Sequence, residues 1–401
     1  MSSSEMHGAR KALEGVRVLD LTHQVAGPSS TMALAMLGAE VIKVERPGSD
    51  ESQRFPFFLV NVSKRSVSVD LKSEKGVEAV LNLAEQCDIF VENFRPGVIE
   101  RLGLGYDVVS ARNERLIYAQ LRGFAADSEF ASYTCYDPIA QAMGGAFSIT
   151  GEVDGRPLQP GPDLADSGTG MIMAITLLAA LYQREHTGLG QRIELAMSDH
   201  IATFNRLHYA WPIERGVTTP RSGNAVPFVR RVAPGDTYPT PPFGPDDYVY
   251  IYAGTNGQWT DLLKGIDRLD LADDPRLQTP EERGQHHEEL DQILTVWCST
   301  RHKLEVMRLL GPAGVPCAAV RGVKEVYEDQ EMRDRGIFQE IVHPELGPIY
   351  APSWPAKLSG TDVIVKPPSQ PGADNDSILG DLLGMSAEEI AEAAGVAQAK
   401  S

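Results

Sequence analysis

The stretch SVSVDLKSEKGVEAVLNLAEQCDIFVE, residues 66–92, contains a strand, a helix and a second strand in one short run. Residues 66–71 and 88–92 are the β-rich ends of this stretch. Between them, residues 74–86 carry apolar side chains at the i, i+3, i+4, i+7 spacing of an amphipathic helix, namely Val77, Val80, Leu81 and Ala84. A helix between two strands predicts a βαβ unit, in which the strands run parallel.

The same alternation of strands and helices continues on both sides of this unit. Further β-rich runs occupy residues 16–21, 40–45, 116–121 and 191–197. Short strands that alternate with helical stretches are typical of a parallel sheet, so the predicted fold class is α/β with a Rossmann-like sheet. Ligands of such sheets gather at the carboxyl ends of the strands.

At 401 residues, the chain is too long for one ordinary core. Residues 1–210 are expected to form the first part of a large domain. Residues 211–247, rich in Pro, Gly, Arg and Thr, are expected to form a linker or irregular excursion. Residues 248–330, which begin with an alternating strand, predict a smaller domain, and residues 331–401 are too short to fold alone and should return to the large domain.

The composition excludes several classes of partner. A formal net charge of −18 would repel polyanions, so no nucleic-acid partner is expected. No apolar run is long enough to cross a membrane, and the N-terminus has no secretory pattern, which predicts a cytoplasmic protein without a membrane partner. The four cysteines lie far apart in the sequence, and His286 and His287 point in different directions on a helix, so no metal site is predicted.

Several common enzyme motifs are missing. The stretch LDLTHQVAGPSST, residues 19–31, has one glycine, Gly27, where a dinucleotide fold would place G-x-G-x-x-G. A Walker A loop, an H-E-x-x-H helix and a G-x-S-x-G elbow are also absent from the sequence. These absences argue against the commonest dinucleotide, nucleotidase, zinc-protease and serine-hydrolase functions.

Asp166 opens an apolar helical stretch and has two interpretations. Aspartate is a favoured N-cap, so Asp166, or Asp163 before it, can simply satisfy free amides of the first helical turn. Alternatively, Gly168 and Gly170 leave bare backbone beside the carboxylate, which would admit a bulky electrophile or stabilise an oxyanion. A carboxylate near a helix N-terminus should stay ionised and could attack an acyl carbon. The local sequence does not decide between these interpretations.

A wider pattern is formed by seven segments, which follow one another in this order: VLDLTHQVAGP (18–28), LGAEVIKVERPG (37–48), NVSKRSVSVDLKSEKG (61–76), VENFRPG (91–97), YDPIAQAMGG (136–145), DSGTGM (166–171) and TGLGQRIELAMSD (187–199). Taken together, these segments resemble the family III CoA-transferases, or CaiB/BaiF family, which includes formyl-CoA transferase, carnitine CoA-transferase and the α-methylacyl-CoA racemases. The resemblance continues more weakly through YIYAGTNGQW (250–259) and GVPCAAV (314–320).

This resemblance implies an architecture and a set of partners. The large Rossmann-like domain would bind CoA and be built from both ends of the chain, with a smaller α+β domain inserted between them. Two chains would interlock as rings in a homodimer. The partners would be an acyl-CoA and a small carboxylic acid, dicarboxylic acids included, and no cofactor would be tightly bound.

The resemblance also implies a mechanism. Asp166 falls where the family's aspartate attacks the acyl-CoA thioester to give a mixed anhydride and CoA thiolate. The thiolate then returns to form an aspartyl-CoA thioester, which the acceptor carboxylate attacks in turn. Each step exchanges one activated acyl group for another, so neither ATP nor a metal is needed.

By the same resemblance, a set of residues falls at family contacts to CoA. Arg46, Lys72 and Arg101 would hold its phosphates and adenine end. The other implied contacts are Val25, Ala26, Val69, Asp70, Leu71, Asn93, Phe94, Arg95, Thr134, Cys135, Tyr136 and Asp137.

The sequence departs from formyl-CoA transferase in three places, which argues against oxalate as the acceptor. One of them is the stretch of residues 48–61, which is shorter here. The glutamine before AGP lies one place earlier, so the run reads Gln24 and then Val25. The glycine-rich loop over the oxalate site has no counterpart near residues 223–236. Arg221, Arg230 and Arg231 lie in this region, and one of them could instead clamp the second carboxylate of a dicarboxylic acid.

Two other functions fit the sequence less well. A racemase needs an acid/base pair, and that branch has a histidine where this chain has Tyr136, a poor base at neutral pH. An inactive CoA-binding partner subunit would be expected to have a damaged nucleophile segment, whereas DSGTGM is intact. A CoA-transferase is therefore favoured over both.

Overall fold

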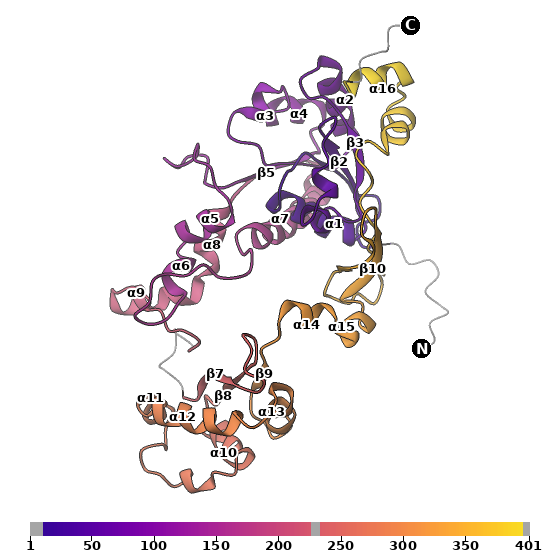
Figure 1. The fold of residues 1–401 in the computed structure, drawn as a ribbon. Coiled ribbons are helices and arrows are strands. Elements are labelled where there is room, and N and C mark those ends of the chain that lie inside the picture. The colour runs from indigo at the N-terminus through magenta and orange to yellow at the C-terminus, as the bar shows by residue number, and fades with distance from the viewer. Residues whose placement is uncertain (1–10, 226–232, 396–401) are drawn as a thin grey trace. The chain divides into compact units, whose positions relative to one another are not determined.

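The computed structural model describes residues 11–225 and 233–395, which divide into two compact units (Figure 1). Unit 1 holds the described residues of Met1–Gly145, Pro160–Phe204 and Glu331–Ser401. Unit 2 holds those of Ala146–Gln159 and Asn205–Gln330. Each unit contains its own cluster of buried apolar side chains.

Unit 1 is built on a six-stranded sheet with the order β3-β2-β1-β4-β5-β6. Every pair of neighbouring strands is parallel. The central strand β1 sets the register, because Val18 lies opposite both Val41 of β2 and Ile89 of β4. The prediction of a parallel α/β sheet is confirmed, with strands at Arg17–Asp20 (β1), Glu40–Glu45 (β2), Arg65–Ser68 (β3), Ile89–Glu92 (β4), Ile117–Arg122 (β5) and Arg192–Ala196 (β6).

Helices cover both faces of this sheet (Figure 1). On one face, α2 and α16 pack with apolar strand side chains such as Leu19, Ile42 and Phe90. On the other face, α1 packs against α7, which also contacts β5. The helices of unit 1 are Ala26–Met36 (α1), Glu74–Glu85 (α2), Val98–Arg101 (α3), Tyr106–Arg112 (α4), Asp137–Met143 (α5), Asp166–Thr187 (α7), Met197–Phe204 (α8) and Ala387–Ala393 (α16), with α15 at its boundary (Gln330–Asp334).

The C-terminal segment of the described chain belongs to unit 1. Asp374 binds the first residues of β3, accepting the backbone N–H of Ser66 at 2.9 Å and lying 3.0 Å from Arg65. Lys75 on α2 lies 2.8 Å from Glu389 on α16. The same segment supplies a π-helix at Asp376–Leu382 and an antiparallel hairpin of Phe338–His343 (β10) and Gly347–Pro352 (β11).

A buried ion pair joins β1 to the start of β3. Asp20 Oδ2 and Lys64 Nζ lie 2.9 Å apart, and the two side chains are 0% and 1% exposed. Lys64 Nζ also donates to the Pro28 carbonyl at 2.9 Å and to Asn61 Oδ1 at 3.0 Å. Burial lowers the pKa of Lys64 to about 7. Because Pro28 lies in the first turn of α1, this pair holds the start of α1 against the sheet.

Unit 2 has a three-stranded antiparallel sheet with the order β7-β8-β9. Apolar side chains of α10, α12 and α13 pack with β8 in a core that includes Trp259, Leu294 and Val306. Its elements are Ala146–Ile149 (α6), Ala210–Arg215 (α9), Gly235–Pro239 (β7), Tyr248–Tyr252 (β8), Asn256–Gly265 (α10), Pro280–Gln285 (α11), His287–Cys298 (α12), Lys303–Leu310 (α13), Cys317–Ala319 (β9) and Val323–Tyr327 (α14).

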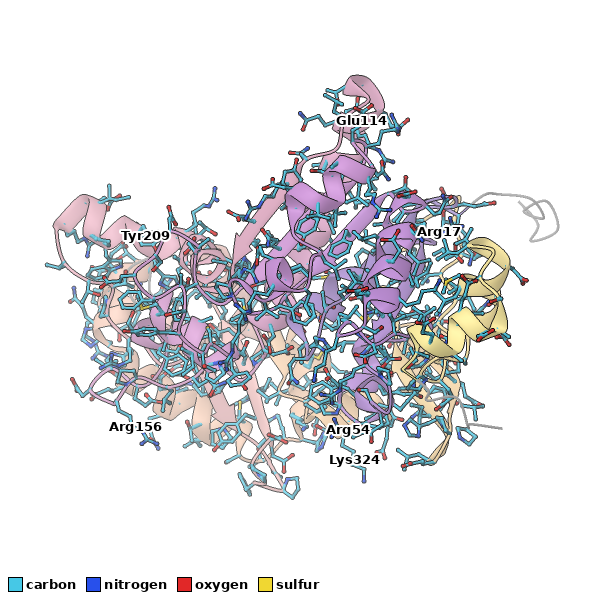
Figure 2. The ribbon with its side chains drawn as sticks, turned by 90° about the horizontal axis from the view of Figure 1, so that it is seen from above. Arg17, Arg54, Glu114, Arg156, Tyr209 and Lys324 are labelled. Atoms are coloured by element: carbon cyan, nitrogen blue, oxygen red, sulfur yellow. The ribbon has the colours of Figure 1, made fainter. Side chains whose placement is uncertain are left out.

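Charged side chains such as Arg54 and Glu114, both labelled in Figure 2, lie exposed at the surface of unit 1. Among residues 11–225 and 233–395, none of the helices combines the length and the apolar character needed to cross a bilayer.

Candidate active site

Asp166 is the first residue of α7 and does not cap that helix. The N-cap position is occupied by Ala165. No side chain at the start of α7 accepts a hydrogen bond from the free backbone amides of its first turn. The capping interpretation of Asp166 is therefore wrong. Asp163 does not cap with its side chain either, because that carboxylate accepts the Ser167 hydroxyl while its backbone carbonyl accepts the Ser167 N–H at 2.9 Å.

The first amides of α7 are instead held by Asp137, the first residue of α5. Asp137 Oδ1 accepts the backbone N–H groups of Ala165 at 2.9 Å and of Asp166 at 3.0 Å. Its other oxygen accepts Gln141 Nε2. The Asp137 side chain is buried, with the residue 8% exposed. The fold therefore supplies the cap from another helix and leaves the Asp166 carboxylate out of the capping network.

The electrostatic surroundings of Asp166 disfavour its charged form. Burial raises the pKa of the Asp166 carboxyl to about 6, and the neighbouring charges of Asp137 and Asp163 act in the same direction. The helix N-terminus was expected to help keep this group ionised, but burial and like charge outweigh the helix dipole and raise its pKa instead. At neutral pH the group is still largely a carboxylate.

Gly168 and Gly170, the two glycines after Asp166, do not leave their backbone open to the approach of a substrate. A Cβ placed on Gly168 would lie 2.9 Å from Nε2 of the buried His200. A Cβ on Gly170 would lie 2.7 Å from both the Ala26 carbonyl oxygen and Ser29 Cβ. These glycines therefore let α8 and α1 approach α7, which corrects the expectation that they admit an electrophile.

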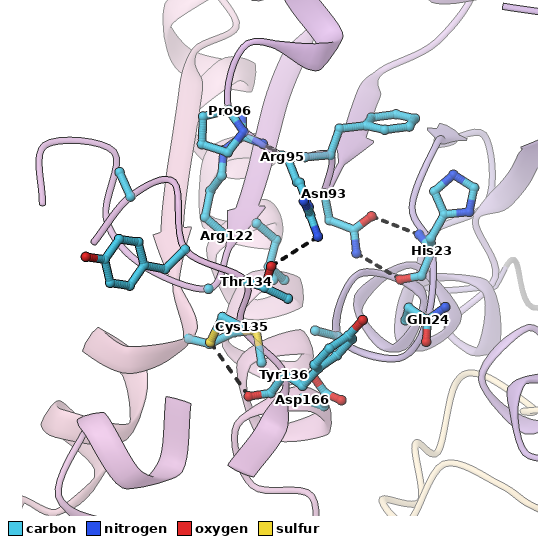
Figure 3. Close-up of a pocket in the computed structure, with 17 residues that line it drawn as sticks. His23, Gln24, Asn93, Arg95, Pro96, Arg122, Thr134, Cys135, Tyr136 and Asp166 are labelled. Atoms are coloured by element: carbon cyan, nitrogen blue, oxygen red, sulfur yellow. Dashed lines mark hydrogen bonds between the residues drawn. The ribbon is translucent and has the colours of Figure 1, made fainter. Parts of the chain in front are cut away.

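Asp166 lies in the wall of a cavity of about 260 Å³ at the carboxyl ends of β4 and β5 (Figure 3). Tyr136 is beside Asp166, and Arg95 reaches across to Thr134 Oγ1 at 3.1 Å. We call this cavity the Asp166 cavity. Its lining residues are His23, Gln24, Ala26, Asn93, Phe94, Arg95, Pro96, Leu121, Arg122, Gly123, Ala131, Tyr133, Thr134, Cys135, Tyr136, Asp166 and Met197.

Two polar contacts hold the loops that form this cavity. Asn93 and the backbone of His23 exchange two hydrogen bonds, each 2.8 Å long, which joins the loops after β1 and β4. Arg122 lies 2.9 Å from the buried Glu92 and also donates to the Phe94 carbonyl. Neither Arg122 nor Glu92 is among the residues predicted for the site, although their positions at the ends of predicted strands were a signal that could have identified them.

A second cavity, of about 360 Å³, adjoins the first along the sheet edge, and we call it the β2–β3 cavity. His23, Gln24 and Phe94 line both cavities. Gln24 has a left-handed backbone with φ 64°, and its N–H donates to Glu51 Oε1 at 2.7 Å. The β2–β3 cavity is lined by Leu21, His23, Gln24, Val44, Glu45, Arg46, Ser49, Glu51, Val69, Asp70, Leu71, Lys72, Phe94 and Leu102.

The structure brings most of the predicted CoA contacts into this region. Lys72 and Arg101 share a more open depression next to the β2–β3 cavity. Val25 and Asp137 do not line any of these three cavities. Ala26, Asn93, Phe94, Arg95, Thr134, Cys135 and Tyr136 line the Asp166 cavity, whereas Arg46, Val69, Asp70, Leu71 and Lys72 line the β2–β3 cavity.

The proposed carboxylate clamp finds little support at Arg221. Its guanidinium donates to the carbonyls of Gly155 at 2.7 Å and Ser148 at 3.3 Å, so the protein already occupies it. Arg230 and Arg231 lie outside the described residues. In the described part of the chain, no three His, Cys, Asp or Glu side chains are grouped as metal ligands.

Comparisons with known proteins give a consistent assignment. The sequence model described as CoA-transferase family III matches residues 13–377. The formyl-CoA:oxalate CoA-transferase of Streptomyces coelicolor is 37% identical over 403 residues, which cover 95% of this chain and 97% of that protein. The enzyme of the same name from Rhodopseudomonas palustris is 36% identical over 408 residues, covering 95% and 96%.

Solved structures agree with this similarity. A CAIB/BAIF family protein from Brucella suis matches with a TM-score of 0.81 and 29% identity, covering 92% of this chain and 98% of that one. Rv3272 from M. tuberculosis matches with a TM-score of 0.80 and 29% identity, covering 92% and 99%.

Proposed function

Because the chain belongs to CoA-transferase family III, we propose that it moves CoA from an acyl-CoA donor to a small carboxylic acid with Asp166 as the nucleophile. One observation carries this proposal: the carboxylate of Asp166 is partly buried, does not cap α7, and lies in the wall of a cavity at the carboxyl ends of the strands. The proposal includes the homodimer of interlocked chains and the cytoplasmic location expected from the sequence. The transferase names of the relatives support this proposal over the racemase and the inactive partner subunit.

The proposed reaction balances without a proton donor or a metal. An Asp166 oxygen attacks the thioester carbon, the C–S bond breaks, and the CoA thiolate leaves behind a mixed anhydride. The thiolate attacks the aspartyl carbonyl of this anhydride and releases the donor acid as a carboxylate. The acceptor carboxylate attacks the resulting aspartyl-CoA thioester, the thiolate leaves again, and its attack on the acceptor's carbonyl carbon forms the new acyl-CoA and restores Asp166.

The surroundings of Asp166 suit this chemistry. A carboxylate that has lost part of its hydration and has no bond to the α7 amides is a better nucleophile than a capping carboxylate. The Asp166 cavity has room for a thioester end and a small acid, but little more. The β2–β3 cavity, with Arg46 and Lys72, continues from it and is the proposed place of the CoA body.

The relatives named above carry the name formyl-CoA:oxalate CoA-transferase, so formyl-CoA and oxalate belong in any substrate panel. The positions of Gln24 and Val25 argue for also testing larger dicarboxylates. The protein should be mixed with formyl-, acetyl- or succinyl-CoA and each acid, and the products weighed by mass spectrometry. A new acyl-CoA supports the proposal, and none from any pair would oppose it.

The rate of transfer should fall as the solution becomes more acidic than about pH 6. Only the carboxylate attacks, and burial raises the pKa of Asp166 to about 6, so protonation below that pH removes the nucleophile. We expect kcat to drop about tenfold per pH unit on the acid limb. A midpoint near 3.8, the ordinary value for aspartate, would show that burial does not act on Asp166 as described.

Replacing Arg46, Lys72 or Arg101 by glutamine should weaken acyl-CoA binding selectively. Each is assigned to the phosphate and adenine end, where a charge-assisted bond is worth about 1.5–3 kcal/mol, or about ten- to a hundredfold in KM for acyl-CoA. The KM for the acid should change little. Lys75→Gln on α2 is the matched control, because Lys75 pairs with Glu389 and lines none of the cavities described above. Equal effects on both substrates would contradict the placement.

A further inference from the structure

We propose that Asp137 is a positioning residue that holds the start of α7 so that the Asp166 carboxylate faces the Asp166 cavity, an inference that rests on the proposed function. The resemblance implied that Asp137 contacts CoA. The structure gives its carboxylate other partners, and Asp137 does not line the cavities described above.

The geometry of the contact is that of a helix cap supplied from outside the helix. One oxygen of Asp137 accepts both the Ala165 and Asp166 amides, at 2.9 and 3.0 Å. The Asp166 amide belongs to the same residue whose side chain is the nucleophile, so this bond fixes the Cα from which the carboxylate projects. Asp166 itself does not cap α7, so its carboxylate is not drawn back onto the first turn of the helix.

Gln141 holds Asp137 in turn. Its Nε2 donates to the second Asp137 oxygen and to the Pro162 carbonyl at 3.2 Å, which joins α5 to the segment before α7. Gln141 Oε1 is buried and has no hydrogen-bond partner among the described residues. If Asp137 became asparagine, Gln141 could turn its amide over and accept the new N–H with Oε1. Asp137→Asn therefore preserves an oxygen for the α7 amides and removes the charge, with loss of the Gln141 bond to the Pro162 carbonyl when the amide turns over.

Other charged or titratable groups also surround Asp166 and must be distinguished from Asp137. Besides Asp137, the charge of Asp163 also raises the pKa of Asp166. The remaining groups are His23, Arg95, Arg122, Cys135 and Tyr136 in the cavity wall and His200 of α8 against Gly168. Asp163→Asn is the matched control, because it removes a neighbouring charge without removing an acceptor from the Ala165 or Asp166 amide.

The experiment measures kcat and the KM for acyl-CoA of Asp137→Ala, Asp137→Asn and Asp163→Asn between about pH 5 and 9. Asp137→Ala should lower kcat at its high-pH plateau by about a hundredfold, because the nucleophile is misplaced, and leave KM for acyl-CoA nearly unchanged. Asp137→Asn should keep most of the wild-type kcat at the high-pH plateau. The midpoint of the fall in kcat toward acid should lie at lower pH than in the wild type, because a negative charge near Asp166 is lost. Asp163→Asn should keep a plateau close to the wild type.

Several results would overturn the inference. A raised KM with kcat intact in Asp137→Ala would place the residue in CoA binding, and equal impairment of the Ala and Asn variants would exclude a capping role. If Asp137→Ala does not fold, as judged by its melting curve, a folded Asp137→Asn protein whose kcat has lost its high-pH plateau contradicts the inference by itself. Hydroxylamine trapping on wild-type protein separates the two proposals. If Asp166 is labelled but the Asp137 variants have the kcat of the wild type, only the positioning role is refuted. If Asp166 is not labelled, both proposals are refuted.

Discussion

Asp166→Ala and Asp166→Asn should each lose acyl transfer by on the order of 10⁴- to 10⁶-fold, the scale seen when a covalent nucleophile is removed. Neither replacement can form the anhydride, because an amide or a methyl group has no carboxylate oxygen to attack the thioester. Measured initial rates with the best acyl-CoA and acid pair test this directly. The KM for acyl-CoA should stay near the wild-type value in any residual activity.

The fold should survive these changes. Asp166 does not cap α7, and its carboxyl is held at a raised pKa by burial, so losing the charge removes a cost to the folded state at neutral pH. Melting temperatures equal to or above the wild type are therefore expected. Asp107→Asn is the matched control, an exposed aspartate in the first turn of α4 that should keep full activity. Wild-type turnover in Asp166→Asn would reject the covalent route.

Lys64→Met should destabilise the protein by about 3–5 kcal/mol, the usual cost of leaving one partner of a buried ion pair alone. Methionine fills a similar volume but leaves the Asp20 carboxylate without its 2.9 Å partner and the Pro28 carbonyl without its donor. Urea unfolding at fixed protein concentration measures the loss. Because Lys64 holds the start of α1 beside the Asp166 cavity, activity should fall together with stability.

Two further variants make this prediction specific. Lys75→Met breaks the exposed pair with Glu389 and should have little effect, because solvent screens that contact. The double variant Asp20→Asn with Lys64→Met removes the unpaired charge and should regain part of the lost stability. A Lys64→Met protein as stable as the Lys75→Met protein would show that the buried pair contributes nothing.

The parallel sheet could be predicted because its strands are locally distinct. Val18, Leu19 and their counterparts in β2 and β4 are buried from both faces and form short β-rich runs, and the helix at 74–86 has a clear period. Strand ends shifted by only a few residues, as in β3, which ends at Ser68 rather than 71. Local pattern is sufficient here because each strand packs against helices on two sides.

The details of the site depend on contacts between distant residues and could not be predicted locally. Asp166 precedes an apolar helix, as an N-cap does, and only the fold shows that Asp137, from another helix, takes the amides. Likewise, the glycines near Asp166 suggested open backbone, but His200 and Ala26 fill the space beside them. The resemblance pointed to Asp166 and to a set of CoA contacts most of which line the cavities, yet it gave no indication of the cap.

The most direct test of Asp166 as the nucleophile is to find where the acyl group or CoA becomes attached. Wild-type protein is mixed with acyl-CoA, treated with neutral hydroxylamine, digested and mapped by mass spectrometry. The proposed mechanism predicts a hydroxamate at Asp166 that depends on acyl-CoA and is absent from the neighbouring Asp163 and Asp137. A hydroxamate on a different carboxylate, or active protein that never acquires one, would contradict it.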